Sequence, residues 1–269
     1  MKYYDQHLHT RFSFDSEEDP ENYLKIAEAR GVPVFVSTEH LEFNWDNRGE
    51  DWMPDFTAQT ALYRDLSEKY PSVDIRRGVE FGYKSDRVKD AMALIKKHGF
   101  RLVNLSVHDY KGIDLYDPEI CKTIAPEEFL TGNFLKVIEA VSSDLEFDVL
   151  CHVDYPFKTA YTADKSLKIS AYEDFLKEIF KTVIRRNRAI EINKKVQDRI
   201  GSREHLEYIL DLYKSLGGTL LTFSTDSHKV DKYLPDATDI LSIIKSRGFD
   251  SLCFFDDHKP RLVKIDELF

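Results

Sequence analysis

Two histidines near the N-terminus, separated by one residue, are the first feature that could perform chemistry. His7 and His9 follow a short β-prone start, so we expect both at the end of a first strand with their imidazoles on one face. Asp15 follows a few residues later, where a loop could fold it back to the same point. Two imidazoles and a carboxylate on one point suit a divalent metal ion. An ordinary polar strand end with an incidental histidine pair is the alternative.

Strand-like and helix-like segments alternate from residue 20 onward and would have to position these side chains. We predict strands over 33–38, 73–80, 101–107, 147–152, 188–193 and 219–225, and helices over 20–30, 55–70, 85–98, 127–141, 170–186, 202–216 and 234–247. Residues 41–54 and 109–126 are expected to be loops, and 251–255 a short terminal strand. Repeated strand–helix units indicate a parallel sheet, and their number predicts a closed βα barrel. With no linker or repeat in the sequence, we expect one domain over 1–269.

Further polar residues fall at the predicted C-terminal ends of the strands, where βα barrels carry their chemistry. They are His40, Glu80, His108, His152, Asp226 and His228. With the first three residues they make nine candidate ligands, which suit three ions if a carboxylate such as Glu80 bridges two of them. Histidine and carboxylate ligands without cysteine fit zinc, manganese or iron. The other histidines are expected to have surface or capping roles: His98, His205 and His258.

The composition narrows the class of protein. With 269 residues and 42% hydrophobic content, the chain can form one large core. No apolar run approaches the roughly 20 residues of a membrane span, and the start lacks the apolar region of a signal peptide, so we expect a soluble, cytoplasmic protein. Three scattered cysteines without a CxxC pattern argue against disulfides and thiolate metal sites. A net charge of −10 disfavours binding to nucleic acid.

The order and context of the candidate ligands resemble the motifs of the PHP (polymerase and histidinol phosphatase) superfamily. The matching motifs are His7-Leu8-His9-Thr10, Glu39-His40, Gly78-Val79-Glu80, Ser106-Val107-His108, Cys151-His152-Val153-Asp154 and Thr225-Asp226-Ser227-His228. The resemblance covers nearly the whole chain and implies a distorted (βα)7 barrel, similar to a TIM barrel, with three metal ions. Many family members have histidine where this chain has Asp15, a change that keeps a donor atom but alters the charge of the site.

The resemblance also implies which ligands share an ion. The first ion would take His7, His9, Glu80 and Asp226, the second Glu80, His108 and His152, and the third Asp15, His40 and His228. Three divalent ions, three carboxylates and a bridging hydroxide leave a charge of roughly +2, which matches a phosphate monoester dianion. Glu80 and Asp226 are the expected catalytic residues, Glu80 as a bridge and Asp226 as acceptor of the nucleophile's proton.

Within the superfamily, the length and the lack of appended domains resemble the histidinol-phosphate phosphatase branch. This resemblance implies a metal-dependent phosphomonoesterase that hydrolyses L-histidinol phosphate to L-histidinol and phosphate in histidine biosynthesis. Lys158 and Arg199, past the fifth and sixth strands, could bind the phosphate. Glu42, past the second strand, could bind the ammonium or imidazole of this substrate. Each of these three could equally be a solvated loop charge.

Two other functions stay open. A PHP-type exonuclease or a broad small-molecule or nucleotide phosphoesterase would share the metal ligands, although the acidic charge and the absence of a polymerase module count against it. A non-catalytic module, in which metals only brace the barrel, fits less well because a structural zinc needs four ligands and no open position. The sequence predicts a small phosphate monoester as partner, no membrane and no particular oligomeric state.

Overall fold

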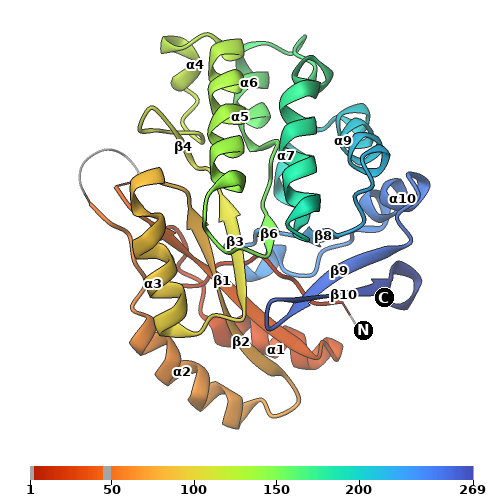
Figure 1. Cartoon of the computed structure of the whole chain (residues 1–269). Helices are drawn as coiled ribbons and strands as arrows, with labels where there is room; N and C mark the ends of the chain where they lie inside the picture. Colours follow the sequence, from red (N-terminus) through yellow and green to blue (C-terminus); the bar gives the residue numbers. More distant parts are fainter. Residues whose placement is uncertain (1–2, 45–49, 269) are drawn as a thin grey trace.

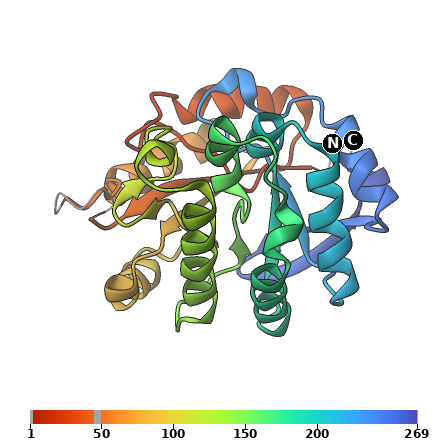
Figure 2. The ribbon, with the colours of Figure 1, turned by 90° about the horizontal axis from the view of Figure 1, so that it is seen from above.

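The computed structural model describes residues 3–44 and 50–268, and a curled parallel sheet with helices outside it forms the centre of this part of the chain (Figures 1 and 2). The strand order is β1-β2-β3-β6-β7-β8, and every neighbouring pair is parallel. The strands are β1 (Val34–Glu42), β2 (Asp74–Gly82), β3 (Leu102–Ser106), β6 (Val149–Leu150), β7 (Ala189–Asn193) and β8 (Leu221–Ser224). All six predicted strands after the first are therefore present.

The N-terminal segment closes the seam between β1 and β8. Leu8 forms an isolated parallel bridge with Ser227, and its carbonyl accepts a hydrogen bond of 2.9 Å from Thr38 N. The segment thus takes the seventh position of a distorted barrel, although it contains no regular strand. The Asp5 carboxylate explains the irregular backbone, because it accepts a hydrogen bond from the His7 amide at 3.1 Å. The prediction that this segment forms a regular first strand is therefore wrong. Lys2, near the start of the segment, lies outside the described residues.

Seven helices agree with the prediction to within four residues at either end. They are α1 (Pro20–Arg30), α2 (Phe56–Lys69), α3 (Val88–His98), α5 (Pro126–Ser142), α7 (Glu173–Arg185), α9 (Arg203–Ser215) and α10 (Thr238–Ser246). Local chemistry sets their ends. Asp19 and Asp55 accept hydrogen bonds from the first amides of α1 and α2, while Gly31 and Gly99 end α1 and α3 in the left-handed conformation.

Several short elements were not predicted. The helices α4 (Ile120–Thr123), α6 (Tyr155–Ala163) and α8 (Lys194–Ile200) follow strand ends or lie in long connections, and β4 (Asp109–Tyr110) pairs with β5 (Ile113–Asp114) inside the expected loop 109–126. The terminal strand extends as β9 (Ser251–Asp256) and pairs with β10 (Lys259–Lys264). Of the expected loop 41–54, residues 45–49 lie outside the described residues.

Buried apolar side chains form one continuous cluster that includes residues from the N-terminal segment, the sheet and the surrounding helices. No helix in the described ranges is both long and apolar enough to cross a membrane. The two ends of the described chain meet, because Tyr3 N donates a hydrogen bond of 3.2 Å to the carbonyl of Leu268 (Figure 1). One end of this barrel carries the polar residues described next.

Candidate metal centre

All nine predicted ligands gather at the C-terminal end of the sheet, around Glu80 in β2. Glu80 Oε1 lies 3.0 Å from His152 Nε2 and 3.2 Å from His108 Nε2. Glu80 Oε2 lies 3.1 Å from His7 Nε2 and 3.1 Å from His40 Nδ1. His9 Nε2 also lies 3.4 Å from Oε2, so one oxygen of this carboxylate faces two imidazoles and the other faces three.

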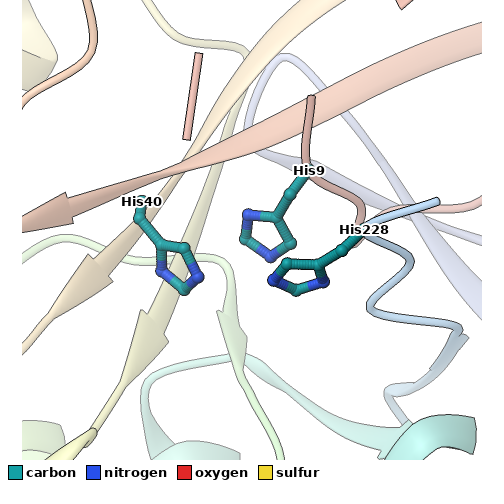
Figure 3. Close-up of side chains that lie close together, drawn as sticks. All are labelled: His9, His40 and His228. Carbon is teal, nitrogen blue, oxygen red and sulfur yellow. The ribbon is translucent and has the colours of Figure 1, made fainter. Parts of the chain in front are cut away.

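The remaining ligands adjoin this group. His9 Nε2 lies 3.3 Å from Asp226 Oδ1. The rings of His9, His40 and His228 face one another from three separate segments (Figure 3), with centroids 4.2 Å apart for His9 and His40 and 4.3 Å apart for His9 and His228. Asp15 Oδ2 is 2.9 Å from His228 Nε2 and 3.5 Å from His40 Nε2.

The grouping of ligand atoms agrees only in part with the one that the resemblance implies. Among the described residues, five triplets have possible ligand atoms within 4.8 Å of one another. Four of them consist of predicted ligands: His7, His9 and Asp226; His7, Glu80 and His152; His40, Glu80 and His108; and His9, His40 and His228. The fifth joins His7 to Cys151 and Glu191. His108 and His152, expected on the same ion, fall in different triplets, and Asp15 falls in none of them. His40, expected with the third ion, also lies beside Glu80 and His108. His40 thus sits between two of the expected ion positions.

Unpartnered polar atoms show that this cluster fits a cation. The Nε2 atoms of His7 and His9, Nδ1 of His40 and Oε2 of Glu80 are buried and have no hydrogen-bond partner among the described residues. Their close approaches to one another lack the geometry of hydrogen bonds. A buried polar atom without a partner costs about 1–3 kcal/mol. Divalent ions would give these donor atoms the partner that the protein does not supply.

Two buried glutamates accept hydrogen bonds from the Nδ1 atoms of candidate ligand histidines. Glu191 in β7 accepts hydrogen bonds from His7 Nδ1 at 2.7 Å and from the backbone amide of His152 at 2.9 Å. Glu42 at the end of β1 accepts a bond of 2.6 Å from His108 Nδ1. Such carboxylates fix the tautomer and the orientation of the ring. With 1% of its surface exposed, Glu42 has the position of a residue that orients His108, and it does not line the cleft where a substrate would meet it.

Sequence reasoning assigned no role to Glu191 or Lys195, and it named Glu39 only as part of a motif. A single charge inside the apolar run of β7 could have indicated Glu191, because carboxylates are seldom fully buried without a partner. Glu39 accepts bonds of 2.7 Å from the hydroxyls of Thr10 and Ser13, and so holds the loop that leads to Asp15. No spacing signal pointed to Lys195, which follows β7 by two residues.

Two of the candidate ligands have a strained backbone. His152 and Asp226 have φ angles of 26° and 50°, in a region that non-glycine residues seldom adopt. The surrounding structure holds both, because the His152 amide donates to Glu191 and the Asp226 amide donates to the His7 carbonyl at 2.8 Å. Strain of this kind commonly concentrates at functional sites.

The charges of the cluster are strongly coupled. Burial alone would lower the pKa of His7, but Glu80 and Glu191 outweigh it and raise that pKa well above its usual value. Burial alone would raise the pKa of Glu80, but His7 and His108 hold it well below its usual range. Burial and the neighbouring His40 lower the pKa of His9. Protons and metal ions therefore compete for the same atoms, so metal affinity should fall as the pH falls.

A cleft of about 420 Å³ opens above the cluster. Besides ligands, it is lined by Phe14, Asp114, Tyr116, Tyr155, Lys195 and Arg199. Lys195 and Arg199 come from α8, and Lys195 Nζ lies 3.3 Å from Asp226 Oδ2. Lys158 belongs to α6 rather than to a loop, and its Nζ lies 3.3 Å from the ring centroid of Tyr155 and 4.4 Å from that of Tyr116. Two cations thus line one wall, with a third beside it.

Comparison with known proteins adds to this geometry. A model of the PHP domain matches residues 5–195. A probable histidinol-phosphatase of Clostridium acetobutylicum is 29% identical over 231 residues, which cover 85% of this chain and 87% of that protein. The histidinol-phosphatase of Lactococcus lactis subsp. lactis is 28% identical over 263 residues, 96% of each chain.

A solved structure is also similar. The crystal structure of histidinol phosphate phosphatase from Lactococcus lactis subsp. lactis, complexed with zinc, L-histidinol and phosphate, superimposes with a TM-score of 0.83 at 27% identity. The match covers 95% of this chain and 97% of that one. The predicted barrel architecture is confirmed by this likeness.

Proposed function

The chain belongs to the PHP-domain family, and from this premise we propose that it is a metal-dependent phosphomonoesterase that hydrolyses L-histidinol phosphate to L-histidinol and inorganic phosphate. The observation that carries the proposal is the convergence of nine ligands on Glu80 beneath a cleft with cationic walls. The similarity to relatives named histidinol-phosphatase supports the choice of substrate. Such a reaction belongs to histidine biosynthesis, and the expected cytoplasmic location agrees with it.

The nine clustered residues would hold the ions, and we retain the proposal of three ions of zinc, manganese or iron. The zinc complex of the similar Lactococcus lactis enzyme supports zinc among these. When bound, such ions lower the pKa of a coordinated water and stabilise charge on the phosphoryl oxygens. Glu80 would contact more than one of them, because each of its oxygens faces at least two histidines.

The protein's own cations would bind and orient the phosphate. Lys195 and Arg199 line the cleft from α8, and Lys158 approaches it from α6. Asp226 lies beside them. Burial alone would raise the pKa of Asp226, but Lys195 and His7 hold it well below its usual range, so the carboxylate stays ionised. Asp226 can then accept a hydrogen bond from the attacking water and receive its proton as the water oxygen bonds to phosphorus. It can pass this proton to the alcohol oxygen as the P–O bond to the alcohol breaks.

Asp114 takes the role that the sequence suggested for Glu42. It is the carboxylate of the cleft lining, within the described residues, that does not belong to the nine ligands. Its Oδ1 accepts a bond of 2.8 Å from the amide of Tyr116, which fixes its position at the end of β5. Asp114 is half-buried, and a carboxylate in that position can pair with the ammonium or imidazole of the alcohol.

The test compares kcat/KM for L-histidinol phosphate and for propyl phosphate, which lacks both cationic groups. One charged hydrogen bond is worth about 1.5–3 kcal/mol, so the wild type should prefer L-histidinol phosphate by at least about tenfold. Asp114→Asn should reduce this ratio by about tenfold or more, since the pairing charge is lost. Asp117→Asn, on the same segment but outside the cleft lining, is the matched control. A wild type without preference would contradict the assigned substrate, and an unchanged ratio would contradict the role of Asp114.

A further inference from the structure

Asp154 immediately precedes α6, two residues after His152, but its side chain does not cap that helix. By contrast, the side chains of Asp19, Asp55 and Asn193 each accept hydrogen bonds from the first amides of their helices. A capping bond of this kind is typically worth about 1 kcal/mol. The Asp154 carboxylate is instead turned into the protein, where only 2% of the residue surface is exposed. Another contact must therefore determine its orientation.

That contact is a buried network of four side chains. Asp154 Oδ2 accepts hydrogen bonds from Gln197 Nε2 at 2.7 Å and from His205 Nε2 at 3.2 Å. His205 Nδ1 lies 3.2 Å from the hydroxyl of Tyr161, and a neutral ring with its proton on Nε2 satisfies both contacts. We call these four residues the Asp154 network. His205, expected at the surface or in a cap, is buried with 3% exposure because it belongs to this network.

The network joins three helices through one carboxylate. Tyr161 lies in α6, Gln197 in α8 and His205 in α9. Of these helices, α8 depends most on such a contact, because it has seven residues and isolated helices of that length are marginal in water. The side chain of Asn193 holds the N-terminus of α8 through a bond of 3.1 Å to Val196 N.

Gln197 lies on the opposite face of α8 from the two cations of the cleft. Lys195 and Arg199 are four residues apart, so they share one face of the helix, and Gln197 falls midway between them in sequence. Consistent with this, Lys195 and Arg199 line the cleft while Gln197 is buried against the Asp154 carboxylate. The bond between Gln197 and Asp154 therefore opposes rotation of α8 about its axis, which would move both cations.

We propose that the Asp154 network, acting through Gln197, positions the phosphate-binding face of α8. The inference rests on the proposed function only in that Lys195 and Arg199 bind the phosphate group. Gln197 is a positioning residue and touches no substrate. Its loss should weaken the binding of any phosphate monoester and of inorganic phosphate, whatever the alcohol, while the metal ligands on other elements stay in place.

The first experiment measures the dissociation constant of inorganic phosphate by calorimetry on the metal-loaded protein, with the bound ions counted. Gln197→Met keeps the length of the side chain and removes its hydrogen bond, so phosphate should bind about tenfold more weakly at unchanged metal content. Asn133→Leu removes a buried amide in α5, outside the cleft lining, and should change the constant less than about twofold. Unchanged phosphate binding in Gln197→Met would overturn the inference.

A second measurement separates positioning from a general structural effect. In a Lys195→Met/Arg199→Met background, Gln197→Met should change phosphate affinity less than about twofold, because no cationic face remains to be displaced. The same tenfold loss in both backgrounds would overturn the inference. If Gln197→Met does not fold, His205→Phe tests the network from its other side and should weaken phosphate binding in the parent background only. A protein that behaves as expected here but shows no preference for L-histidinol phosphate would contradict the proposed substrate alone.

Discussion

Lys158 is a residue whose surroundings should make phosphate binding depend on pH. It is half-buried in α6, close to the faces of Tyr155 and Tyr116. Burial, with a smaller contribution from the positive charge of Lys195, lowers the pKa of Lys158 to about 7. In the free protein the ammonium form therefore predominates below about pH 7, and the neutral amine predominates above it.

We predict that Lys158 makes phosphate binding weaken as the pH rises from about 6.5 to 8.5. The loss arises because a neutral amine no longer attracts the phosphate dianion. Lys158→Arg should flatten this dependence, since a guanidinium stays charged throughout the range. The measurement is the dissociation constant of inorganic phosphate against pH for both proteins. Ionisation of phosphate and of the metal site affects both equally, so parallel curves would show that Lys158 does not titrate near neutrality.

At the scale of single residues, the sequence indicated that the nine candidate ligands would converge, but it did not indicate the residues that support them. The convergence was predictable because strand ends meet in a βα barrel, a rule that needs only approximate strand boundaries. The roles of Glu42 and Glu191 depend on the direction of each side chain, which follows from register and packing. An error of four residues at the end of β1 was enough to place Glu42 in a loop at the cleft.

At the scale of elements, the register of β1 and β2 determines where Glu42 can lie. Glu42 pairs with Gly82 across the two strands. A Cβ atom added at Gly82 would overlap the carboxylate of Glu42, so the missing side chain provides the space that this carboxylate occupies. The same carboxylate holds His108 Nδ1 at 2.6 Å. The glycine therefore contributes to the geometry of a metal ligand that it does not touch.

We predict that Gly82→Ala lowers metal affinity by displacing the Glu42 carboxylate from His108. Loss of a carboxylate that orients a ligand histidine typically reduces metal affinity about 10–100-fold. Titration of the zinc-loaded protein with a competing chelator measures this change. Glu42→Gln should give a loss of similar size, and the double variant should be little worse than either one, because both changes remove the same contact. Additive losses would mean that Gly82 acts by another route.

The elements that the sequence missed are short. Strong periodicity and clear caps predicted the seven longer helices, whereas α6 and α8 have nine and seven residues and begin within five residues of a strand end. Short helices give little periodic signal, and α8 depends on tertiary contacts such as the one from Gln197. The irregular seam segment has a different cause, since the Asp5 side chain binds a backbone amide there. The first case depends on a contact between residues distant in the sequence, whereas the second is a local contact over two residues.

At the scale of the whole molecule, the candidate ligands span the seam where the barrel closes. His7 and His9 lie on the seam segment, His40 lies near the end of β1 on one side, and His228 follows β8 on the other. The seam itself is held by single hydrogen bonds rather than by a full ladder. Ions bound between these residues would join both sides of the seam, and they would also occupy buried atoms that otherwise have no partner.

The last prediction is that removing the ions destabilises the protein, first at the seam. An ion present at 100 times its dissociation constant stabilises the folded state by about 2.7 kcal/mol, and about 1 kcal/mol corresponds to about 2–4 °C in a protein of this size. Chelation should therefore lower the Tm in scanning calorimetry by about 5–10 °C for each ion lost. Amide exchange should accelerate more at His9 and Thr38 than in the paired interior of β2 and β3, because the seam loses its metal bridges.

Elemental analysis of the metal-loaded protein should find between two and three ions per chain. An unchanged Tm after chelation would show that the ions do not brace the barrel, and one ion or none would contradict the trinuclear centre itself.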